Sequence, residues 1–239
     1  MMLLGLDFGW LADPLYIRWL INGTLMTILI SVVGMAAAGA VGVAGAAVIH
    51  LRVPVLHDLA RLLVELFRNT PPLVQLFFLY FMLSDMGLSF TDAAGRSIPL
   101  FGGFTCVVLS LGLYSGAVAV EIIRSGITAV PRQTIEGARS LGYSRAQIFR
   151  EIELPMALRL TMPAMTNNIV SLIKTSAQAS LIAVADVMYY ASQIMLENFR
   201  NLEVMLVIWI IYLLIASGFA GAARMVEHLL RIPGFGSQS

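Results

Sequence analysis

The chain contains 239 residues, of which 59% are hydrophobic and 12% are charged, and its formal net charge is +1. Because a soluble domain carries about a quarter charged residues, this composition excludes a water-soluble globular protein and indicates that the bilayer is the solvent. The near-zero net charge gives no sign of a nucleic-acid partner. Cys106 is the single cysteine, which excludes a disulfide within the chain and a thiolate metal cluster.

Five apolar stretches predict an all-α membrane protein with five transmembrane helices, because a span needs about 20 mainly apolar residues. The expected spans cover about 20–49, 56–83, 98–120, a stretch that begins near Met156, and 204–223. The N-terminus lacks the basic leader of a secretory signal, so we expect it to remain in the mature protein. We therefore predict a single transmembrane domain over residues 1–239, with no appended soluble domain.

The first span carries small residues at every fourth position. These are Gly34, Ala38, Gly42 and Ala46, which share one face of a helix. Small side chains let a second helix approach closely in lipid, where packing drives association. We predict a packing seam here, without a chemical role.

The second span is interrupted by the sequence Arg-Asn-Thr-Pro-Pro at residues 68–72. The two prolines remove amide donors and bend the helix. An arginine at such a bend faces protein or a watery cavity. Arg68 therefore either attracts an anionic substrate or, in the commoner role of such residues, snorkels or caps the helix near the surface.

A polar loop from 84 to 97, with Asp85, Asp92 and Arg96, precedes the third span. At the end of that span Glu121 and Arg124 lie three residues apart on one helical face. This spacing predicts a helix-end ion pair rather than a proton relay.

The polar stretch from Glu136 to Pro155 lies between two apolar runs and predicts a helix, a turn and a second helix outside the membrane. Gly142 suits the end of the first helix, because glycine readily adopts the left-handed backbone conformation. Ser144 and Gln147 form a capping-box pair that starts the second helix. We expect Pro155 to end that helix and to open a new one, because proline disfavours helical geometry in the residue before it.

This stretch resembles the cytoplasmic coupling loop of permease subunits in ABC-type importers. The family pattern is Glu-Ala-Ala, three residues, Gly, nine residues, Ile, one residue and Leu-Pro, and every spacing is kept here, with Gly137 replacing one Ala. The resemblance implies a type I ABC importer permease fold whose loop, about 131–155, docks onto a separate ATPase. The coupling residues that it implies are Glu136, Gly137, Ala138, Arg139, Leu141, Gly142, Ile152, Leu154 and Pro155. The alternative is an ordinary cytoplasmic loop with two amphipathic helices.

Three further segments resemble the polar amino-acid permeases of this family. Residues 67–78 look like the subfamily's Arg-Gly-Thr-Pro segment, with Asn69 in place of Gly, and residues 115–132 are also similar. Residues 173–176 are similar to Leu-Lys-Asp-Thr-Ser but lack its Asp. The resemblance implies a polar amino acid, or a derivative such as an opine, as substrate. The candidate pathway residues are Arg68, Lys174, Thr175, Ser176 and Gln178.

Two features of the second half leave alternatives open. Lys174 lies about 28 Å along a helix from Pro155, at 1.5 Å per residue, and either faces a cavity or reaches the interface. Residues 179–196 are expected to form an interfacial or re-entrant helix on the far side of the membrane. A complete sixth crossing by these residues is the alternative.

The arginines predict the orientation, because positively charged loops stay cytoplasmic. The richer side has Arg52, Arg61, Arg132, Arg139, Arg145, Arg150, Arg224 and Arg231, whereas the other side has Arg18, Arg96 and Arg200. We expect the N-terminus outside and the coupling loop and C-terminus inside, and the family resemblance implies that the membrane is a bacterial inner membrane. A sixth span would move the C-terminal arginines outside.

No phosphate-binding loop and no catalytic constellation are found in the sequence, so we expect a transport subunit rather than an enzyme. His50, His57 and His228 lie near predicted helix ends, where an interfacial location explains them better than metal binding. The resemblance implies that ATP and Mg bind to a partner ATPase, with no cofactor in this chain. The implied partners are two copies of that ATPase, a second permease subunit, identical or similar, and a periplasmic solute-binding protein.

Two other functions compete with ATP-driven import. An ion-coupled secondary carrier would use Glu121 or Lys174 as its proton site and would need no ATPase. A non-transporting membrane anchor or assembly subunit is the second alternative. Neither accounts for the spacing of the coupling motif.

Overall fold

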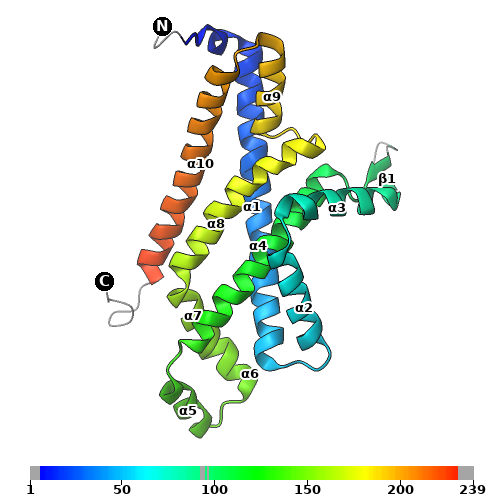
Figure 1. The fold of residues 1–239 in the computed structure, drawn as a ribbon. Helices are drawn as coiled ribbons and strands as arrows, with labels where there is room; N and C mark the ends of the chain where they lie inside the picture. Colours follow the sequence, from blue (N-terminus) through cyan, green and yellow to red (C-terminus); the bar gives the residue numbers. More distant parts are fainter. Residues whose placement is uncertain (1–5, 92–94, 96, 231–239) are drawn as a thin grey trace. The chain divides into compact units, whose positions relative to one another are not determined.

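The computed structural model describes residues 6–91, 95 and 97–230, and these are almost entirely helical (Figure 1). The elements are, in chain order, η1 (Gly9–Ala12), α1 (Pro14–Leu51), α2 (Leu56–Asn69), α3 (Pro72–Asp85), β1 (Ser89–Thr91), β2 (Ser97–Pro99), α4 (Gly103–Thr128), α5 (Arg132–Ser140), α6 (Arg145–Ile148), the π-helix η2 (Phe149–Glu153), α7 (Leu154–Leu160), α8 (Met162–Ser176), η3 (Ala177–Ile182), α9 (Val187–Asn198) and α10 (Asn201–Leu230).

Three of the described helices are long and apolar enough to cross a bilayer: α1, α4 and α10. A fourth crossing results if α8–η3 and α9, which meet at a bend of 52°, form one broken span. The apolar helix α3 has 14 residues, roughly 21 Å at 1.5 Å per residue, which is shorter than the hydrocarbon core. The chain is therefore multi-pass, and the count of five spans stays a prediction.

The expected second span consists of two helices rather than one. Helix α2 ends at Asn69, Thr70 is extended, and α3 begins at Pro72. The break falls at the predicted place, because a residue before proline is pushed out of helical geometry. Helix α2 is amphipathic, with charged residues along one side and exposed leucines along the other. Of the two helices, only α3 is apolar.

The described residues divide into two compact units, each built from three separated segments of the chain. The first unit contains the described residues within 1–34, 72–111 and 172–218, and the second contains those within 35–71, 112–171 and 219–239. The break between η3 and α9 therefore lies wholly within the first unit, and the polar loop lies wholly within the second.

In the first unit, the first half of α1 packs against α9 and the start of α10 (Figure 1). Leu20, Ala191 and Val204 are among the buried residues of this core. Gly23 permits the close approach, because a Cβ there would lie 2.7 Å from the Cα of Val187. Apolar burial and a small residue together hold α9 against α1.

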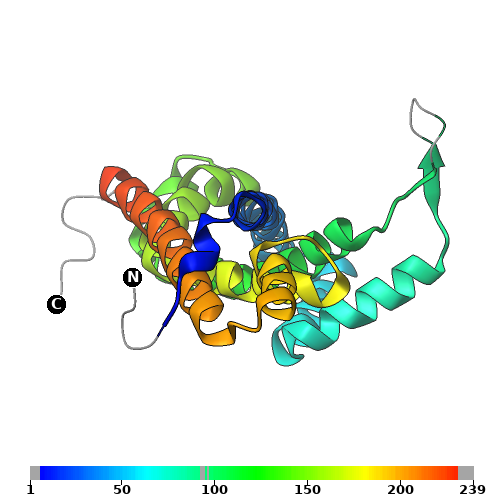
Figure 2. The same ribbon diagram turned by 90° about the horizontal axis from the view of Figure 1, so that it is seen from above.

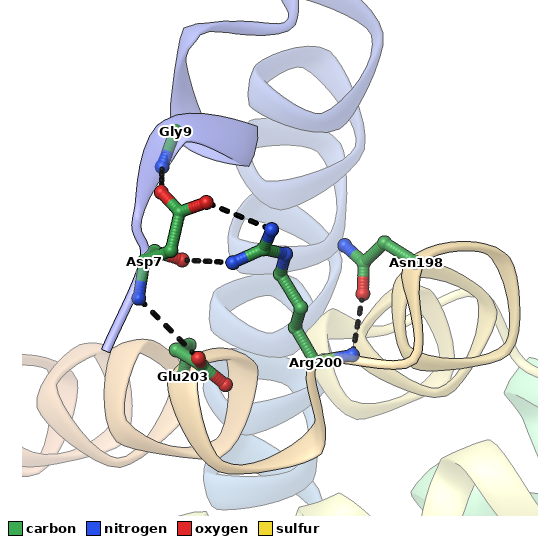
Figure 3. Close-up of polar contacts among 5 residues, drawn as sticks. All are labelled: Asp7, Gly9, Asn198, Arg200 and Glu203. Atoms are coloured by element: carbon green, nitrogen blue, oxygen red, sulfur yellow. Dashed lines mark hydrogen bonds and ion pairs between the residues drawn. The ribbon is translucent and has the colours of Figure 1, made fainter. Parts of the chain in front are cut away.

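A polar clamp joins the N-terminal segment to the turn between α9 and α10 in the same unit (Figure 3). The Asp7 carboxylate lies 2.7 Å from the Arg200 guanidinium, which also donates a hydrogen bond to the Asp7 carbonyl. The Gly9 N–H donates to the same carboxylate. That hydrogen bond, with the nearby Arg200 charge, lowers the pKa of Asp7 from its ordinary value.

The break between η3 and α9 is stabilised by a fully buried carboxylate. Asp186 caps α9 by accepting a hydrogen bond from the Tyr189 N–H at 2.8 Å, and it also accepts one from the Tyr212 hydroxyl at 3.4 Å. The Val187 N–H donates to the Thr27 hydroxyl of α1. The helix pair fits either the predicted re-entrant segment or a broken span, so that prediction stays open.

The predicted polar loop at 84–97 contains a short hairpin carried at the far end of α3 (Figure 2). Strands β1 and β2 pair antiparallel, with Phe90 opposite Ile98. Asp92 and Arg96 lie outside the described residues, so their roles in the predicted loop stay predictions.

In the second unit, the later part of α1 packs against α4 along small residues, which confirms the predicted seam. A Cβ at Gly42 would lie 2.7 Å from the Cβ of Ala119, and one at Gly116 would lie 2.7 Å from Val41. Ala38 and Ala46 on this seam are buried. Close backbone approach of two helices is the usual basis of their association in lipid.

Candidate functional site

The polar loop between α4 and α7 consists of α5, a tight turn, α6 and the π-helix η2. Helix α5 ends at Ser140 and is followed by Leu141 and by Gly142, whose φ is +87°. The Gly142 N–H donates to the Arg139 carbonyl and the Tyr143 N–H donates to the Ala138 carbonyl. This pair of hydrogen bonds is a Schellman motif, which confirms the predicted role of Gly142.

The turn leads directly into a second capped helix. The Ser144 hydroxyl accepts a hydrogen bond from the Gln147 N–H, and the Gln147 side chain accepts one from the Ser144 N–H. The predicted capping box is therefore confirmed. With the last turn of α5 and the first turn of α6 both closed by hydrogen bonds, the tip of the loop has a defined shape.

The expected helix end before Pro155 is wrong. The backbone stays helical from Arg145 into α7, and Pro155 occupies the first turn of α7 behind the π-helical residues 149–153. The Leu154 N–H donates to the Phe149 carbonyl, five residues back. The wider π turn makes room for a proline ring that would otherwise clash with the carbonyl of the preceding turn. The loop and α7 therefore form one continuous arm.

Three contacts fasten this arm to the end of α1. The buried Glu153 carboxylate lies 2.8 Å from His50 Nε2, across 103 residues of sequence. The Phe149 ring stacks on the His50 ring, with centroids 5.5 Å apart. The Arg145 guanidinium donates to the His50 carbonyl at 2.7 Å. Sequence reasoning placed His50 at a helix end but missed this anchor, because no local signal links it to Glu153.

The coupling-motif residues differ in exposure. Glu136, Gly137, Arg139, Leu141 and Gly142 are exposed, Ala138 is buried, and Ile152, Leu154 and Pro155 are intermediate. Within the described residues, no side-chain hydrogen bond or ion pair involves Glu136. A Cβ at Gly137 would have no atom within 4 Å, so the usual alanine would fit there.

An apolar surface at the loop tip adds a residue that the sequence analysis missed. Leu141 is 79% exposed and Tyr143 is 40% exposed, although this polar stretch lies between membrane helices. Large exposed apolar side chains outside the membrane commonly mark a protein interface. Tyr143 could have been found as the aromatic residue of an otherwise polar turn.

The candidate pathway residues belong to both units. Arg68 is exposed in the last turn of α2, in the second unit. Lys174, Thr175 and Ser176 end α8 in the first unit, and Gln178 follows in η3. Lys174 is exposed, but Ser176 is fully buried and its hydroxyl donates to the Ile173 carbonyl. The Ser176 hydroxyl is therefore hydrogen-bonded within its own helix. The pathway role of all five residues stays a prediction.

The predicted ion pair at the end of α4 is confirmed. Arg124 Nη1 lies 2.7 Å from Glu121 Oε1, and both side chains are 35% exposed. This arrangement holds both charges in place at the helix end. Across residues 6–91, 95 and 97–230, no three His, Cys, Asp or Glu side chains gather as metal ligands.

Comparison with known proteins identifies the family of this chain. Residues 38–232 match the family described as binding-protein-dependent transport system inner membrane component. The glutamine transport system permease protein GlnP of Escherichia coli (strain K12) is 30% identical over 227 residues, which cover 95% of this chain and 100% of that protein. The octopine transport system permease protein OccM of Rhizobium radiobacter is 31% identical over 173 residues, covering 72% and 69%.

A solved structure agrees with these sequence relatives. The crystal structure of an amino acid ABC transporter with histidines matches with a TM-score of 0.78 and 29% identity, over 95% of this chain and 99% of that one. These relatives are named as permease proteins of a glutamine and an octopine transport system, and the solved structure as an amino acid ABC transporter. The chain thus belongs to the family of binding-protein-dependent transport system inner membrane components, as a multi-pass permease subunit.

Proposed function

We propose that this chain is the permease subunit of an ATP-driven importer in a bacterial inner membrane and that, with a second permease subunit, it forms the pathway for a polar amino acid or a derivative such as an opine. The substrate class rests on the relatives named for glutamine and octopine and on the solved amino-acid transporter. The expected orientation places the N-terminus outside and the coupling loop inside.

The geometry of the coupling loop is the observation that carries the proposal. Its tip combines a defined turn with exposed Leu141, Tyr143 and Glu136. Its base is fastened to the end of α1 through Glu153 and His50. A partner that grips the tip can therefore move α7 and α1 together, because the arm between them is continuous and anchored.

The proposed partners supply ATP hydrolysis, substrate delivery and the rest of the pathway. Two ATPase copies bind ATP and Mg and close on the loop, and a periplasmic solute-binding protein delivers the substrate. A second permease subunit, identical or similar, completes the pathway, since the helices of one chain are too few to enclose it. Arg68, Lys174, Thr175, Ser176 and Gln178 are the candidate pathway residues, with Ser176 the weakest because of its burial.

Reconstitution tests the proposal directly. The chain is purified in mild detergent, the proteins that copurify are identified, and the complex is placed in liposomes with its solute-binding protein. We expect a polar amino acid to stimulate ATP hydrolysis and to accumulate inside. Uptake that proceeds without an ATPase and collapses with a protonophore would instead establish the secondary carrier. Transport by a complex that lacks this chain would establish a non-transporting subunit.

A further inference from the structure

Two pockets in the second unit lie end to end along the same three helices, α1, α2 and α4. The first, about 540 Å³, is polar. Its lining residues are Ile49, His50, Arg52, His57, Arg61, Glu121, Arg124, Ser125, Thr128 and Arg145. The second, about 280 Å³, is lined only by apolar residues, from Val41 to Val48 on α1, Ala60 to Phe67 on α2 and Leu113 to Val120 on α4. On α1 and α4 the lining residues change from apolar to polar within one helical turn.

The polar pocket is strongly basic. Among its described lining residues, four arginines face one glutamate. Glu121 is paired with Arg124, and Arg145 donates to the His50 carbonyl. Arg52 and Arg61 have no side-chain hydrogen bond or ion pair within the described part of the chain. The pocket therefore offers two uncommitted guanidinium groups, and guanidinium binds phosphate through paired hydrogen bonds.

The backbone around Arg52 departs from the favoured regions. Arg52 has a φ of +53° and Val55 a φ of +64°, both in the turn between α1 and α2. Such conformations are costly for residues other than glycine, and they persist where surrounding structure holds them. Here the turn carries Arg52, which lines the pocket together with Arg61.

The polar pocket lies at the ends of two helices that can span the membrane, α1 and α4. Leu59, Leu62 and Leu66 follow one face of α2 and are between 48% and 63% exposed. Asp58, Arg61, Glu65 and Arg68 share the other side. The ends of membrane-spanning helices reach the level of the lipid headgroups.

We propose that these two pockets bind one anionic phospholipid from the leaflet on the side of the coupling loop. Its phosphate pairs with Arg52 and Arg61, and an acyl chain enters the apolar pocket between α1, α2 and α4. The match is between a negative headgroup and a basic pocket, and between a hydrocarbon chain and an apolar one. Basic pockets between membrane helices are recognised sites for acidic headgroups. That this leaflet is the cytoplasmic one is the only part of the proposal that rests on the proposed function.

The site adjoins the anchor of the coupling arm. His50 and Arg145 line the polar pocket and also hold the arm to α1. Bound lipid therefore stabilises the same helix ends that the coupling arm contacts. A complex in a membrane without acidic lipid lacks this support.

Lipid binding by the full chain is measured by native mass spectrometry in detergent. Phosphatidylglycerol and phosphatidylcholine with identical acyl chains are titrated separately. We expect the acidic lipid to bind more tightly. Replacement of both exposed arginines in R52Q/R61Q should weaken its binding by about 25-fold, from about fivefold for each cation near an anionic headgroup. The single variant R61Q should lose about fivefold, which preserves the test if the double variant folds poorly.

The control variant is R224Q, which removes an exposed arginine of α10 outside both pockets. We expect its lipid affinity to stay within about twofold of the wild type. A44F fills the apolar pocket, so it should weaken the binding of the phospholipid and leave the binding of glycerol phosphate unchanged. If the site instead takes a soluble phosphate, A44F should leave the binding of both ligands unchanged.

Three results would overturn the proposal. One is equal binding of the two phospholipids, and another is an R61Q affinity equal to that of R224Q. The third is a photocrosslinker at position 61 that, in the assembled complex, captures an acidic protein segment instead of lipid. None of these results depends on transport, so each would leave the proposed function standing.

Discussion

The coupling loop and the break between η3 and α9 both interrupt helices, but they place their polar residues differently. In the loop, Glu136 and Arg139 are exposed, and the left-handed position is a glycine. In the break, Asp186 is fully buried and bonded to Tyr189 and Tyr212, and the left-handed position is Ala183.

This difference indicates what each region is for. The loop satisfies its backbone internally and leaves its side chains for a partner. The break uses its polar side chain to satisfy its own neighbours. Changes in the loop should therefore affect coupling more than folding, and changes in the break should affect folding more than coupling.

The largest effect is expected from Gly142→Val. Its φ of +87° excludes a β-branched residue without strain, although no atom lies within 4 Å of a Cβ there. The turn should change shape, and amino-acid uptake in liposomes should fall at least about tenfold, with membrane insertion unchanged. Gly142→Asn is the control, because asparagine tolerates left-handed geometry. Normal uptake by the valine variant would contradict the role of the turn.

The break should respond mainly in stability. Asp186→Ala removes the cap of α9 and leaves the Tyr212 hydroxyl without that acceptor, which should cost about 2 kcal/mol. For a chain of this size, the midpoint of thermal unfolding in detergent should fall by about 4–8 °C. Asp186→Asn keeps an acceptor oxygen and should lose less. An unchanged midpoint together with a loss of uptake would mean that the break serves coupling rather than folding.

The anchor of the loop can be tested with two glutamates of the same π-helix. Glu153 is buried against His50, whereas Glu151 is exposed beside Arg150. Glu153→Ala should lower the uptake achieved per ATP hydrolysed several-fold and destabilise the chain by about 1–3 kcal/mol. Glu151→Ala should change stability by less than about 1 kcal/mol. Equal behaviour of the two variants would show that the anchor transmits nothing.

The smallest effect is expected at Gly137. A methyl group there meets no atom within 4 Å, and alanine favours a helix over glycine by about 0.5–1 kcal/mol. Gly137→Ala should therefore raise thermal stability slightly and leave uptake unchanged, as measured by unfolding and liposome assays. A loss of uptake would mean that the partner requires the bare backbone at this position.

Local signals account for the parts of the fold that the sequence predicted correctly. Gly142, the Ser144 capping box and the prolines after Asn69 each act within a few residues, so the turn, the helix start and the helix break could be predicted from the sequence. The small-residue seam of α1 also followed from helical spacing. The function was predicted through the family resemblance that the motif at residues 136–155 carries.

Other parts depend on contacts or geometry that sequence patterns do not carry. The contact between His50 and Glu153 joins residues 103 positions apart. Pro155 failed to end a helix because a π turn accommodates it. The pathway residues could not be ranked from sequence, because the burial of Ser176 depends on packing around α8.

Crosslinking from the loop tip tests the central claim most directly. In a Cys106→Ala background, which removes the single native cysteine, Leu141→Cys is paired with cysteines on the ATPase surface. Phe199→Cys is the control, because Phe199 is 84% exposed and Leu141 is 79% exposed. We expect a disulfide between the ATPase and position 141 that changes with nucleotide, and none at position 199. Crosslinking at position 199 alone, or at neither, would contradict the account.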